Sequence, residues 1–313
     1  MTALLVANNG GHVKQLHSLA PRLGLDEDRV WVTVASPQTK ALLEGEEVLL
    51  VDYPDSRDTR ALVRHAREAS ALFRRRRFSK VVSTGSSLAL SVLPQAALRG
   101  LDTAFIESAT RFEGPSMSGR LLAALPGVDV YTQYERRVTR RWRYGGSVFD
   151  GFEASETEPW DGSRPLRVVV TVGSTGAYGF RRLVERMIAV LPEDAEVLWQ
   201  TGSTDVSGLP ITARPSVPGD ELDAAVRRAD AVVAHAGTGT ALGAVEAGKL
   251  PLIVPRRRAH GEHVDDHQSE IATALGNRGI ALVREADALE MADVLQVART
   301  VVARRDDPPP FRW

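Results

Sequence analysis

The stretch His235-Ala236-Gly237-Thr238-Gly239-Thr240 decides how the second half of the chain is interpreted. It follows the apolar run Ala231–Ala234, which is typical of a buried strand, and it opens a segment with helical spacing. A glycine-rich turn between a strand and a helix presents backbone amides to an anion. Glu246 lies six residues after Thr240, and its carboxylate can accept both hydrogen bonds of a ribose diol. Together these residues predict a nucleotide site with Glu246 on the ribose.

The next strand leads into a long polar loop. Gly248-Lys-Leu-Pro251 precedes the strand Leu252–Val254, and Pro255 opens a segment that contains His260, Glu262, His263, Asp265, Asp266, His267 and Gln268. Gln268 can both donate and accept hydrogen bonds, which suits sugar hydroxyls. Histidines beside carboxylates also suit a metal, but the phosphate-binding turn upstream favours a nucleotide. We expect no metal here.

Similar strand and helix patterns cover the rest of the chain. The expected strands are Leu4–Ala7, Val30–Ala35, Val48–Val51, Val81–Ser83, Ala104–Ile106, Val128–Thr132, Val168–Val172, Val197–Gln200, Ala231–Ala234, Leu252–Val254 and Ile280–Val283. Helical stretches such as Asp58–Arg77 lie between them. Strands that alternate with helices indicate parallel βαβ units, with ligands at the carboxyl ends of the strands. The fold class is therefore α/β, with two Rossmann-like domains whose parallel sheets face a central cleft.

The domain boundaries follow from composition. The polar run 153–165 predicts a linker between an N-terminal domain, 1–152, and a C-terminal domain, 166–305. The proline-rich tail 306–313 is expected to be irregular. A net charge of −1 argues against a nucleic-acid partner, and the absence of cysteine excludes thiolate catalysis and disulfides. The start of the chain does not resemble a signal peptide, and no stretch of about 20 apolar residues predicts a membrane span.

Two further glycine-rich loops follow expected strands. Gly10-Gly11-His12 comes after the first strand, where His12 is placed to bond a phosphate or accept a proton near pH 7. Gly173-Ser174-Thr175-Gly176 repeats the arrangement in the second half, and its amides and hydroxyls suit a diphosphate without a metal. Each loop also fits a purely structural turn.

These motifs resemble a known family. From Val168 to about Ala281 the chain is similar to the catalytic half of the two-subunit N-acetylglucosaminyltransferase that extends dolichyl-pyrophosphate-linked sugar, and more distantly to the peptidoglycan N-acetylglucosaminyltransferase that forms lipid II. The motifs that carry this are Gly173-Ser-Thr, Phe180-Arg-Arg-Leu-Val, His235-Ala-Gly-Thr-Gly-Thr, Glu246 and Glu262-His-Val-Asp-Asp-His-Gln268. The first half resembles the partner subunit through Gly10-Gly-His12, Ser83-Thr-Gly85, Phe105-Ile-Glu107-Ser108, Arg111, Ser118-Gly-Arg-Leu-Leu and Val148-Phe-Asp-Gly-Phe152.

The resemblance implies a GT-B fold and an inverting, metal-independent transfer of a hexose or N-acetylhexosamine from a UDP-sugar, with no cofactor. The acceptor would be a lipid-pyrophosphate-linked saccharide in polysaccharide or glycan assembly. The donor residues it implies are Ser174, Thr175, His235, Gly237, Thr238, Gly239, Thr240, Glu246, Asp266, His267 and Gln268. On the acceptor side it implies Gly10, Gly11, His12, Gly85, Glu107 and Arg111. The chain departs from the family in lacking an N-terminal membrane helix and in the basic loop Arg256–His260.

The transfer needs a base for the acceptor hydroxyl. We predict Glu107, directly after a strand, with His12 as the rival and with a plain ion pair to Arg111 as the structural alternative for Glu107. Arginines at 74–77 and between 136 and 143 predict peripheral contact with an anionic membrane from the cytoplasm, unless they form an ordinary solvated face. The segment Met117–Leu125, with Leu121, Leu122 and Leu125, is the expected apolar contact.

Other functions stay open at this point. A transferase for a soluble natural product would share the donor half, and a UDP-sugar 2-epimerase would share the architecture but need no acceptor. A non-catalytic protein with a retained nucleotide site is a third alternative. The sequence leaves N-acetylglucosamine, galactose and glucuronic acid all open as the sugar.

Overall fold

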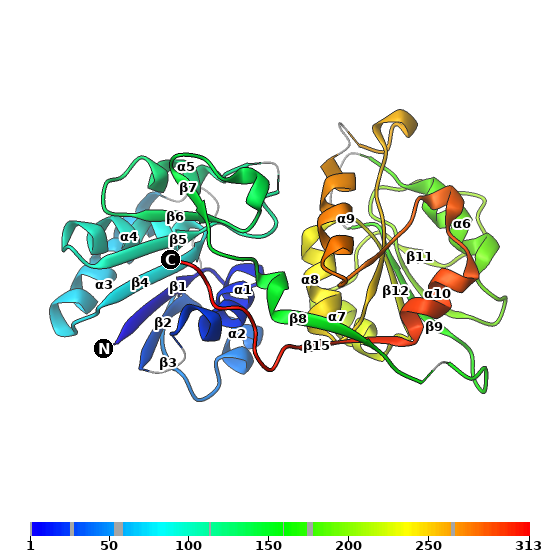
Figure 1. Cartoon of the computed structure of the whole chain (residues 1–313), viewed down its shortest axis with the longest axis horizontal. Coiled ribbons are helices and arrows are strands. Elements are labelled where there is room, and N and C mark those ends of the chain that lie inside the picture. Colours follow the sequence, from blue (N-terminus) through cyan, green and yellow to red (C-terminus); the bar gives the residue numbers. More distant parts are fainter. Residues whose placement is uncertain are drawn as a thin grey trace. The chain divides into compact units, whose positions relative to one another are not determined.

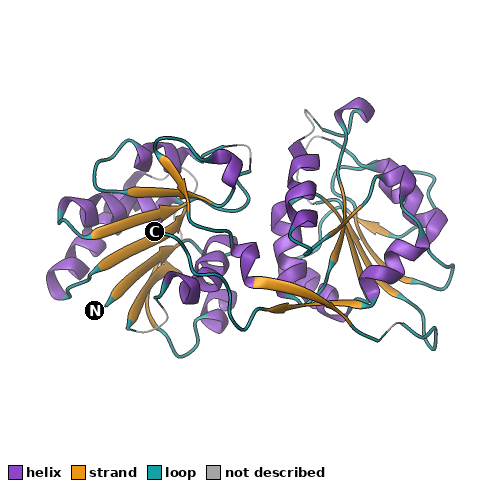
Figure 2. Cartoon of the chain, in the orientation of Figure 1, coloured by secondary structure: helices purple, strands orange, loops and turns teal. Residues whose placement is uncertain are grey.

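The chain forms two compact α/β units. The structure, a computed structural model, describes residues 2–25, 28–52, 59–112, 114–158, 160–173, 178–263 and 267–313. One unit comprises Met1–Gly151 together with Pro308–Trp313, and the other comprises Phe152–Asp307. Figure 1 labels the elements of each unit along the chain, and Figure 2 shows strands and helices alternating in both.

The first unit is built on a parallel sheet of seven strands in the order β3-β2-β1-β4-β5-β6-β7. The strands are β1 (Ala3–Ala7), β2 (Arg29–Val34), β3 (Glu47–Val51), β4 (Lys80–Gly85), β5 (Asp102–Ile106), β6 (Asp129–Thr132) and β7 (Trp142–Tyr144). The helices are α1 (Gly11–Leu19), α2 (Pro37–Leu42), α3 (Thr59–Arg75), α4 (Ser87–Leu98) and α5 (Met117–Ala123). The central strand β1 pairs Leu4 with Val30 on one side and with Val81 on the other.

Both faces of this sheet are covered. Leu4 and Val6 belong to a buried cluster with Leu88 and Val92 of α4 and Leu122 of α5. Side chains alternate along a strand, so Leu5 points to the opposite face, where it is fully buried as well. Burial on both faces explains why the strands are nearly continuous apolar runs.

The second unit repeats the plan with six parallel strands in the order β11-β10-β9-β12-β13-β14. They are β9 (Arg167–Thr171), β10 (Glu196–Gln200), β11 (Ala213–Arg214), β12 (Ala231–His235), β13 (Pro251–Val254) and β14 (Leu282–Val283). The helices are α6 (Arg181–Val190), α7 (Gly219–Arg228), α8 (Thr238–Glu246), α9 (His267–Asn277) and α10 (Met291–Ala298). Val169, Val232, Val226 and Ala244 pack together where α7 and α8 cover the sheet.

The structure revises two predictions, one for the linker 153–165 and one for the C-terminal tail. The expected linker 153–165 begins as a strand, because β8 (Phe152–Glu156) pairs antiparallel with β15 (Thr300–Arg304) in a sheet of their own. The tail after Asp307 is irregular, as expected, but it packs on the first unit. Phe311 is buried against Tyr131, with ring centroids 5.2 Å apart, and its amide donates to the carbonyl of Arg22 at 2.8 Å.

Candidate functional site

Each sheet has a switch point, where consecutive connections leave in opposite directions. It lies between β1 and β4 in the first unit and between β9 and β12 in the second. Open α/β sheets bind ligands outside the carboxyl ends of their strands at such a point. A histidine ring packs on a glycine there in both units: His12 on Gly85, and His235 on Gly173.

His235 ends β12, and its ring leaves no room for a side chain at Gly237. A Cβ at position 237 would lie 2.4 Å from Nε2 of His235, and one at Gly173 would lie 3.1 Å from its Cε1. Burial, and then the charge of Arg256, lower the pKa of His235 to about 4. The ring is therefore neutral at pH 7. Gly237 is required by its contact with His235, a reason that the sequence motif alone does not give.

Helix α8 starts three residues after His235, and no side chain caps its first backbone amides. Its N-cap, Gly237, provides no side-chain cap, and its first turn holds no acidic residue. The first amides of any helix have no acceptor within the helix. A Cβ on Gly239 or Gly243 would meet nothing within 4 Å, so bare backbone is exposed to a ligand here. The sequence predicts an anion site at this helix start.

Glu246 is the last residue of α8. It lies on the same helix face as Gly239 and Gly243, because residues spaced by three or four share a face. The helix rises about 1.5 Å per residue, so Glu246 lies roughly 12 Å from the α8 N-terminus. Glu246 is half-buried. A ligand lying along the two glycines would thus have a carboxylate at one end and free amides at the other.

The remaining predicted donor residues are placed unevenly. Gln268 in α9 is buried, and its Oε1 accepts the amide of Arg256 at 3.1 Å, so one end of its side chain holds the loop after β13. Thr238 is buried and Thr240 half-buried at the start of α8. Three of the predicted residues lie outside the described part of the chain: Ser174, Thr175 and Asp266. The backbone of His267 begins α9, but its side chain is outside the described set.

His12 in the first unit is arranged as a proton acceptor. Its Nδ1 lies 2.7 Å from the carbonyl oxygen of Thr84. A carbonyl can only accept, so Nδ1 carries the hydrogen and Nε2 keeps its lone pair in the neutral ring. Burial lowers the pKa of His12, the Thr84 hydrogen bond opposes this, and the charge of Arg111 lowers it further. The unprotonated ring is therefore favoured over a wider pH range.

Gly85 holds this histidine in place. Its φ is +107°, and a Cβ there would lie 3.0 Å from Cε1 of His12. The hydroxyl of Thr84 also donates to the backbone carbonyl of His12 at 2.8 Å. The ends of β4 and α1 are thus joined around the imidazole. Gly10 and Gly11 face open space, since a Cβ on either would meet nothing within 4 Å.

Glu107 follows β5 as expected, but its carboxylate is engaged inside the unit. It is 4% exposed. Oε2 accepts from the amide of Ser116 at 2.8 Å and from its hydroxyl at 3.0 Å, and Oε1 accepts the amide of Ser108 at 3.2 Å. The alternative of an ion pair with Arg111 is also not observed among the described residues. Burial raises the pKa of Glu107. These contacts fix the loop before α5 and occupy the carboxylate of Glu107.

Asn8 is a residue that the sequence interpretation missed. Its Oδ1 accepts the amides of Ser86 at 3.1 Å and Leu88 at 3.2 Å. The side chain thus satisfies the N-terminus of α4, and the open helix start at this switch point is that of α1. Asparagine is a favoured helix cap, but the helix that Asn8 caps begins near residue 87, so its sequence neighbours give no signal for this contact.

Some of the side chains predicted to form basic and apolar surfaces are engaged within the fold. Arg141 donates to the carbonyls of Ala123, at 2.7 Å, and of Leu125, at 3.2 Å, and so serves the fold. Met117 is 77% exposed and Leu121 is 53% exposed on α5, but Leu122 is fully buried in the core, which corrects its predicted place in the apolar contact. Within the described residues, no helix is long and apolar enough to cross a bilayer.

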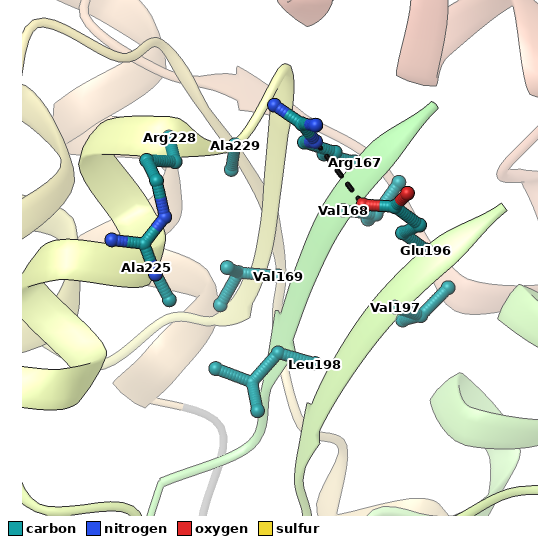
Figure 3. Close-up of a pocket in the computed structure, with 9 residues that line it drawn as sticks. All are labelled: Arg167, Val168, Val169, Glu196, Val197, Leu198, Ala225, Arg228 and Ala229. Carbon is teal, nitrogen blue, oxygen red and sulfur yellow. Dashed lines mark hydrogen bonds and ion pairs between the residues drawn. The ribbon is translucent and has the colours of Figure 1, made fainter. Parts of the chain in front are cut away.

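A cavity of about 430 Å³ lies at the amino ends of strands β9 and β10 in the second sheet, whereas helix α8 starts at the carboxyl end of β12 (Figure 3). Val169, Leu198 and Ala225 line it, and the ion pair of Arg167 with Glu196 stands at the first residues of β9 and β10. These are the amino ends of the strands, so this cavity is separate from the α8 site. Among the described residues no cluster of three histidines or carboxylates could hold a metal ion.

The second unit is similar to a known family of protein domains. Residues 167–300 match the model of the glycosyltransferase family 28 C-terminal domain. The UDP-N-acetylglucosamine–N-acetylmuramyl-(pentapeptide) pyrophosphoryl-undecaprenol N-acetylglucosamine transferase of Prosthecochloris aestuarii is 30% identical over 243 residues, which cover 72% of this chain and 64% of that protein. The aligned regions span between 35% and 65% of the length of the first such relatives.

Solved structures bear on the fold of the whole chain. The MurG structure of Acinetobacter baumannii matches with a TM-score of 0.51 at 17% identity, over 94% of this chain and 88% of that one. The UDP-GlcNAc 2-epimerase of Methanocaldococcus jannaschii matches with a TM-score of 0.57 at 10% identity, over 100% and 96%. At such identities the likeness shows the fold alone, and it confirms the GT-B class predicted from the sequence. The resemblance to the lipid II-forming N-acetylglucosaminyltransferase is likewise confirmed, and residues 167–300 are similar to the glycosyltransferase family 28 C-terminal domain.

Proposed function

We propose that this protein is an inverting, metal-independent glycosyltransferase that moves a hexose or N-acetylhexosamine from a UDP-sugar to a lipid-pyrophosphate-linked saccharide. The observation that carries the proposal is helix α8, whose open N-terminus and terminal carboxylate, Glu246, stand at the switch point of a family 28 domain. The relatives that this chain matches are named for transfer of N-acetylglucosamine from its UDP form to a pyrophosphoryl-undecaprenol acceptor. We therefore propose UDP-N-acetylglucosamine as the first donor to test.

In this proposal the donor binds to the second unit. The diphosphate lies on the amides of Thr238, Gly239 and Thr240, and the ribose diol bonds Glu246. A helix N-terminus stabilises the negative charge that builds on the diphosphate as the bond to the sugar breaks. Gln268 is proposed to lie near the sugar, as are Ser174, Thr175, Asp266 and His267. No cofactor enters the reaction, because UDP is the leaving group of the substrate itself.

The acceptor binds to the first unit and is activated by His12. Nε2 of His12 accepts the proton of the attacking hydroxyl while Nδ1 stays bonded to the carbonyl of Thr84. Arg111, whose charge acts on His12, attracts the acceptor pyrophosphate together with the amides after Gly10 and Gly11. Glu107 keeps the intervening loop in shape through Ser116.

Peripheral contact with the cytoplasmic face of the membrane is the proposed route to a lipid-linked acceptor. Met117 and Leu121 expose apolar side chains on α5, and Arg120 is exposed between them in sequence. Arginine near an anionic surface contributes about 1 kcal/mol of attraction. Binding to vesicles that contain anionic lipid, with loss of binding in high salt, is the expected result.

The test is transfer itself. Purified protein, UDP-N-acetylglucosamine and a polyprenyl-pyrophosphoryl saccharide should yield UDP and a saccharide longer by one sugar, with the anomeric centre inverted. Isomerisation or hydrolysis of the donor without an acceptor would instead favour the 2-epimerase. Transfer to a soluble aglycone, but not to the lipid, would favour the natural-product alternative.

A further inference from the structure

The second unit contains a buried cation that the proposed mechanism does not use. Arg256 is 6% exposed, and its Nη2 donates to the carbonyl of Val172 at 2.7 Å. Its Nε is buried and has no hydrogen-bond partner in the part of the chain that the structure describes. Burial lowers the pKa of Arg256, but a guanidinium stays charged at neutral pH.

The neighbouring acid does not neutralise Arg256. The charge of Glu262 is felt by Arg256, but both oxygens of Glu262 have other partners. Oε1 accepts from Nε of Arg182 at 3.0 Å, and Oε2 accepts from Nη2 of Arg182 at 3.1 Å and from the amide of Arg257 at 2.9 Å. The guanidinium of Arg257 in turn pairs with Glu285. Across the described residues, then, Arg256 has no ion pair, and burying an unpaired charge is costly.

The position of Arg256 brings this charge to the switch point. Arg256 follows β13 by two residues, and Val172 directly follows β9. Strand β12 lies between β9 and β13 in the sheet. An arginine that joins the ends of the two outer strands therefore passes over the carboxyl end of β12, where the chain turns into α8. The effect of Arg256 on the pKa of His235, the last residue of β12, agrees with this path.

The imidazole of His235 lies at the same place. Its buried Nδ1 makes no hydrogen bond of ordinary geometry among the described residues, although the backbone of Thr171 lies near enough to oppose the lowering of its pKa. An open helix start, a buried cation and a neutral imidazole thus meet at one strand end, and among the described residues no carboxylate forms an ion pair with Arg256 there. Strongly perturbed, uncompensated groups of this kind cluster at ligand sites.

We propose that Arg256 is a positioning residue for the donor diphosphate. It fixes the carbonyl of Val172, at the start of the glycine loop, and its charge adds to the field of the α8 N-terminus. The anion that completes the site is a diphosphate, so the nucleoside part gains nothing from Arg256. This inference rests on the proposed function, and it adds a residue that neither the motif nor the open helix identifies.

The experiment compares three ligands on the full-length chain by calorimetric titration: UDP, UMP and uridine. Arg256→Gln should weaken UDP binding at least about tenfold, or about 1.4 kcal/mol, and should leave uridine binding within about twofold because uridine carries no charge. Arg256→Lys, which keeps the charge, should fall between Arg256→Gln and the wild type. The matched control is Arg257→Gln, a neighbouring arginine that already has its own carboxylate.

Each other outcome has one meaning. Equal loss of UDP and uridine binding in Arg256→Gln would show that the residue only supports the local fold, and unchanged UDP binding would show that its charge is not felt. Either result overturns the inference while the proposed function stands, provided that the wild type binds UDP. A wild type that binds neither UDP nor uridine contradicts the proposed function instead.

A measurement on the wild type covers the case in which Arg256→Gln does not fold. The imidazole of His235 is titrated by NMR with and without inorganic pyrophosphate, and its resonance is assigned from His235→Gln. An anion that neutralises Arg256 should raise the pKa of His235 above about 4, since the charge of Arg256 helps to lower it. No change at saturating pyrophosphate would overturn the inference.

Discussion

Replacing His12 by asparagine tests the proposed base. The side-chain amide introduced by His12→Asn would still donate to the carbonyl of Thr84, which now accepts from Nδ1 at 2.7 Å, so the packing on Gly85 should survive. What is lost is the lone pair on Nε2. General base catalysis by a positioned side chain contributes about 10²- to 10⁴-fold to the rate, which is about 3–5 kcal/mol of transition-state stabilisation. We therefore expect kcat to fall by that factor in His12→Asn.

The assay for this variant is UDP release from UDP-N-acetylglucosamine with acceptor, alongside titration of UDP. The affinity for UDP should stay within about twofold, because His12 and helix α8 belong to different units. A kcat within about threefold of wild type would refute the role of His12. If Glu107→Gln alone abolished turnover in a folded protein, the base would be Glu107, as the sequence first suggested.

The pH profile of the wild type gives an independent check on His12. Its pKa lies below the ordinary 6.5, chiefly through burial and to a smaller extent through Arg111. The base form is unprotonated, so kcat/KM should rise with pH through this lowered pKa and be level above it. Arg111→Gln removes a charge that lowers the pKa, so the acid limb should move to higher pH. An acid limb that does not move in Arg111→Gln would contradict the proposed electrostatic contact.

Four further substitutions test other parts of the structure. Gly237→Ala places a Cβ 2.4 Å from Nε2 of His235, so calorimetry should show UDP affinity reduced at least about tenfold. In Gly243→Ala, within α8, the new Cβ meets nothing within 4 Å, so the free energy of unfolding should rise by up to about 1 kcal/mol. Phe311→Ala removes a buried ring and should cost about 3 kcal/mol of unfolding free energy, seen as a lower denaturation midpoint; an unchanged midpoint would mean that the tail does not stabilise the first unit. Leu121→Ser on exposed α5 should reduce binding to anionic vesicles without lowering Tm, and unchanged binding would remove α5 from the membrane contact.

The main strands could be predicted because buried parallel strands are plain apolar runs. Four strands were missed, β7, β8, β11 and β15, and two of them show where this fails. β7 (Trp142–Tyr144) lies in an arginine-rich stretch, and its Arg143 pairs with Asp129 of the neighbouring β6. β8 (Phe152–Glu156) is exposed at every residue after the first, so it shows neither an apolar run nor an alternating pattern. Both strands are specified by their partners, which lie elsewhere in the sequence.

The site was predictable to the extent that it depends on local chain geometry. Glycines between a strand and a helix indicated α8 and α1, but the reason for Gly237 is the ring of His235, which only the folded chain reveals. The contact of Glu107 with Ser116 joins residues nine positions apart. Gly114-Pro115 marks a turn in the sequence between them, but it does not indicate which side chain the loop contacts. Arg256 looked like one of several loop arginines, and its burial without an ion pair among the described residues distinguishes it.

Each switch point brings together one histidine and one glycine, but the two residues follow each other in opposite order along the chain. In the first unit the histidine follows the central strand β1 and the glycine ends β4; in the second the glycine follows β9 and the histidine ends β12. His235, with a pKa of about 4, is a weak proton acceptor at neutral pH, because an effective base has a pKa near the working pH. His12 keeps Nε2 free through its bond to the carbonyl of Thr84. In the proposed mechanism the first switch point supplies the base and the second, beside Arg256, binds the diphosphate, which is the division of roles that sugar transfer from a nucleotide requires.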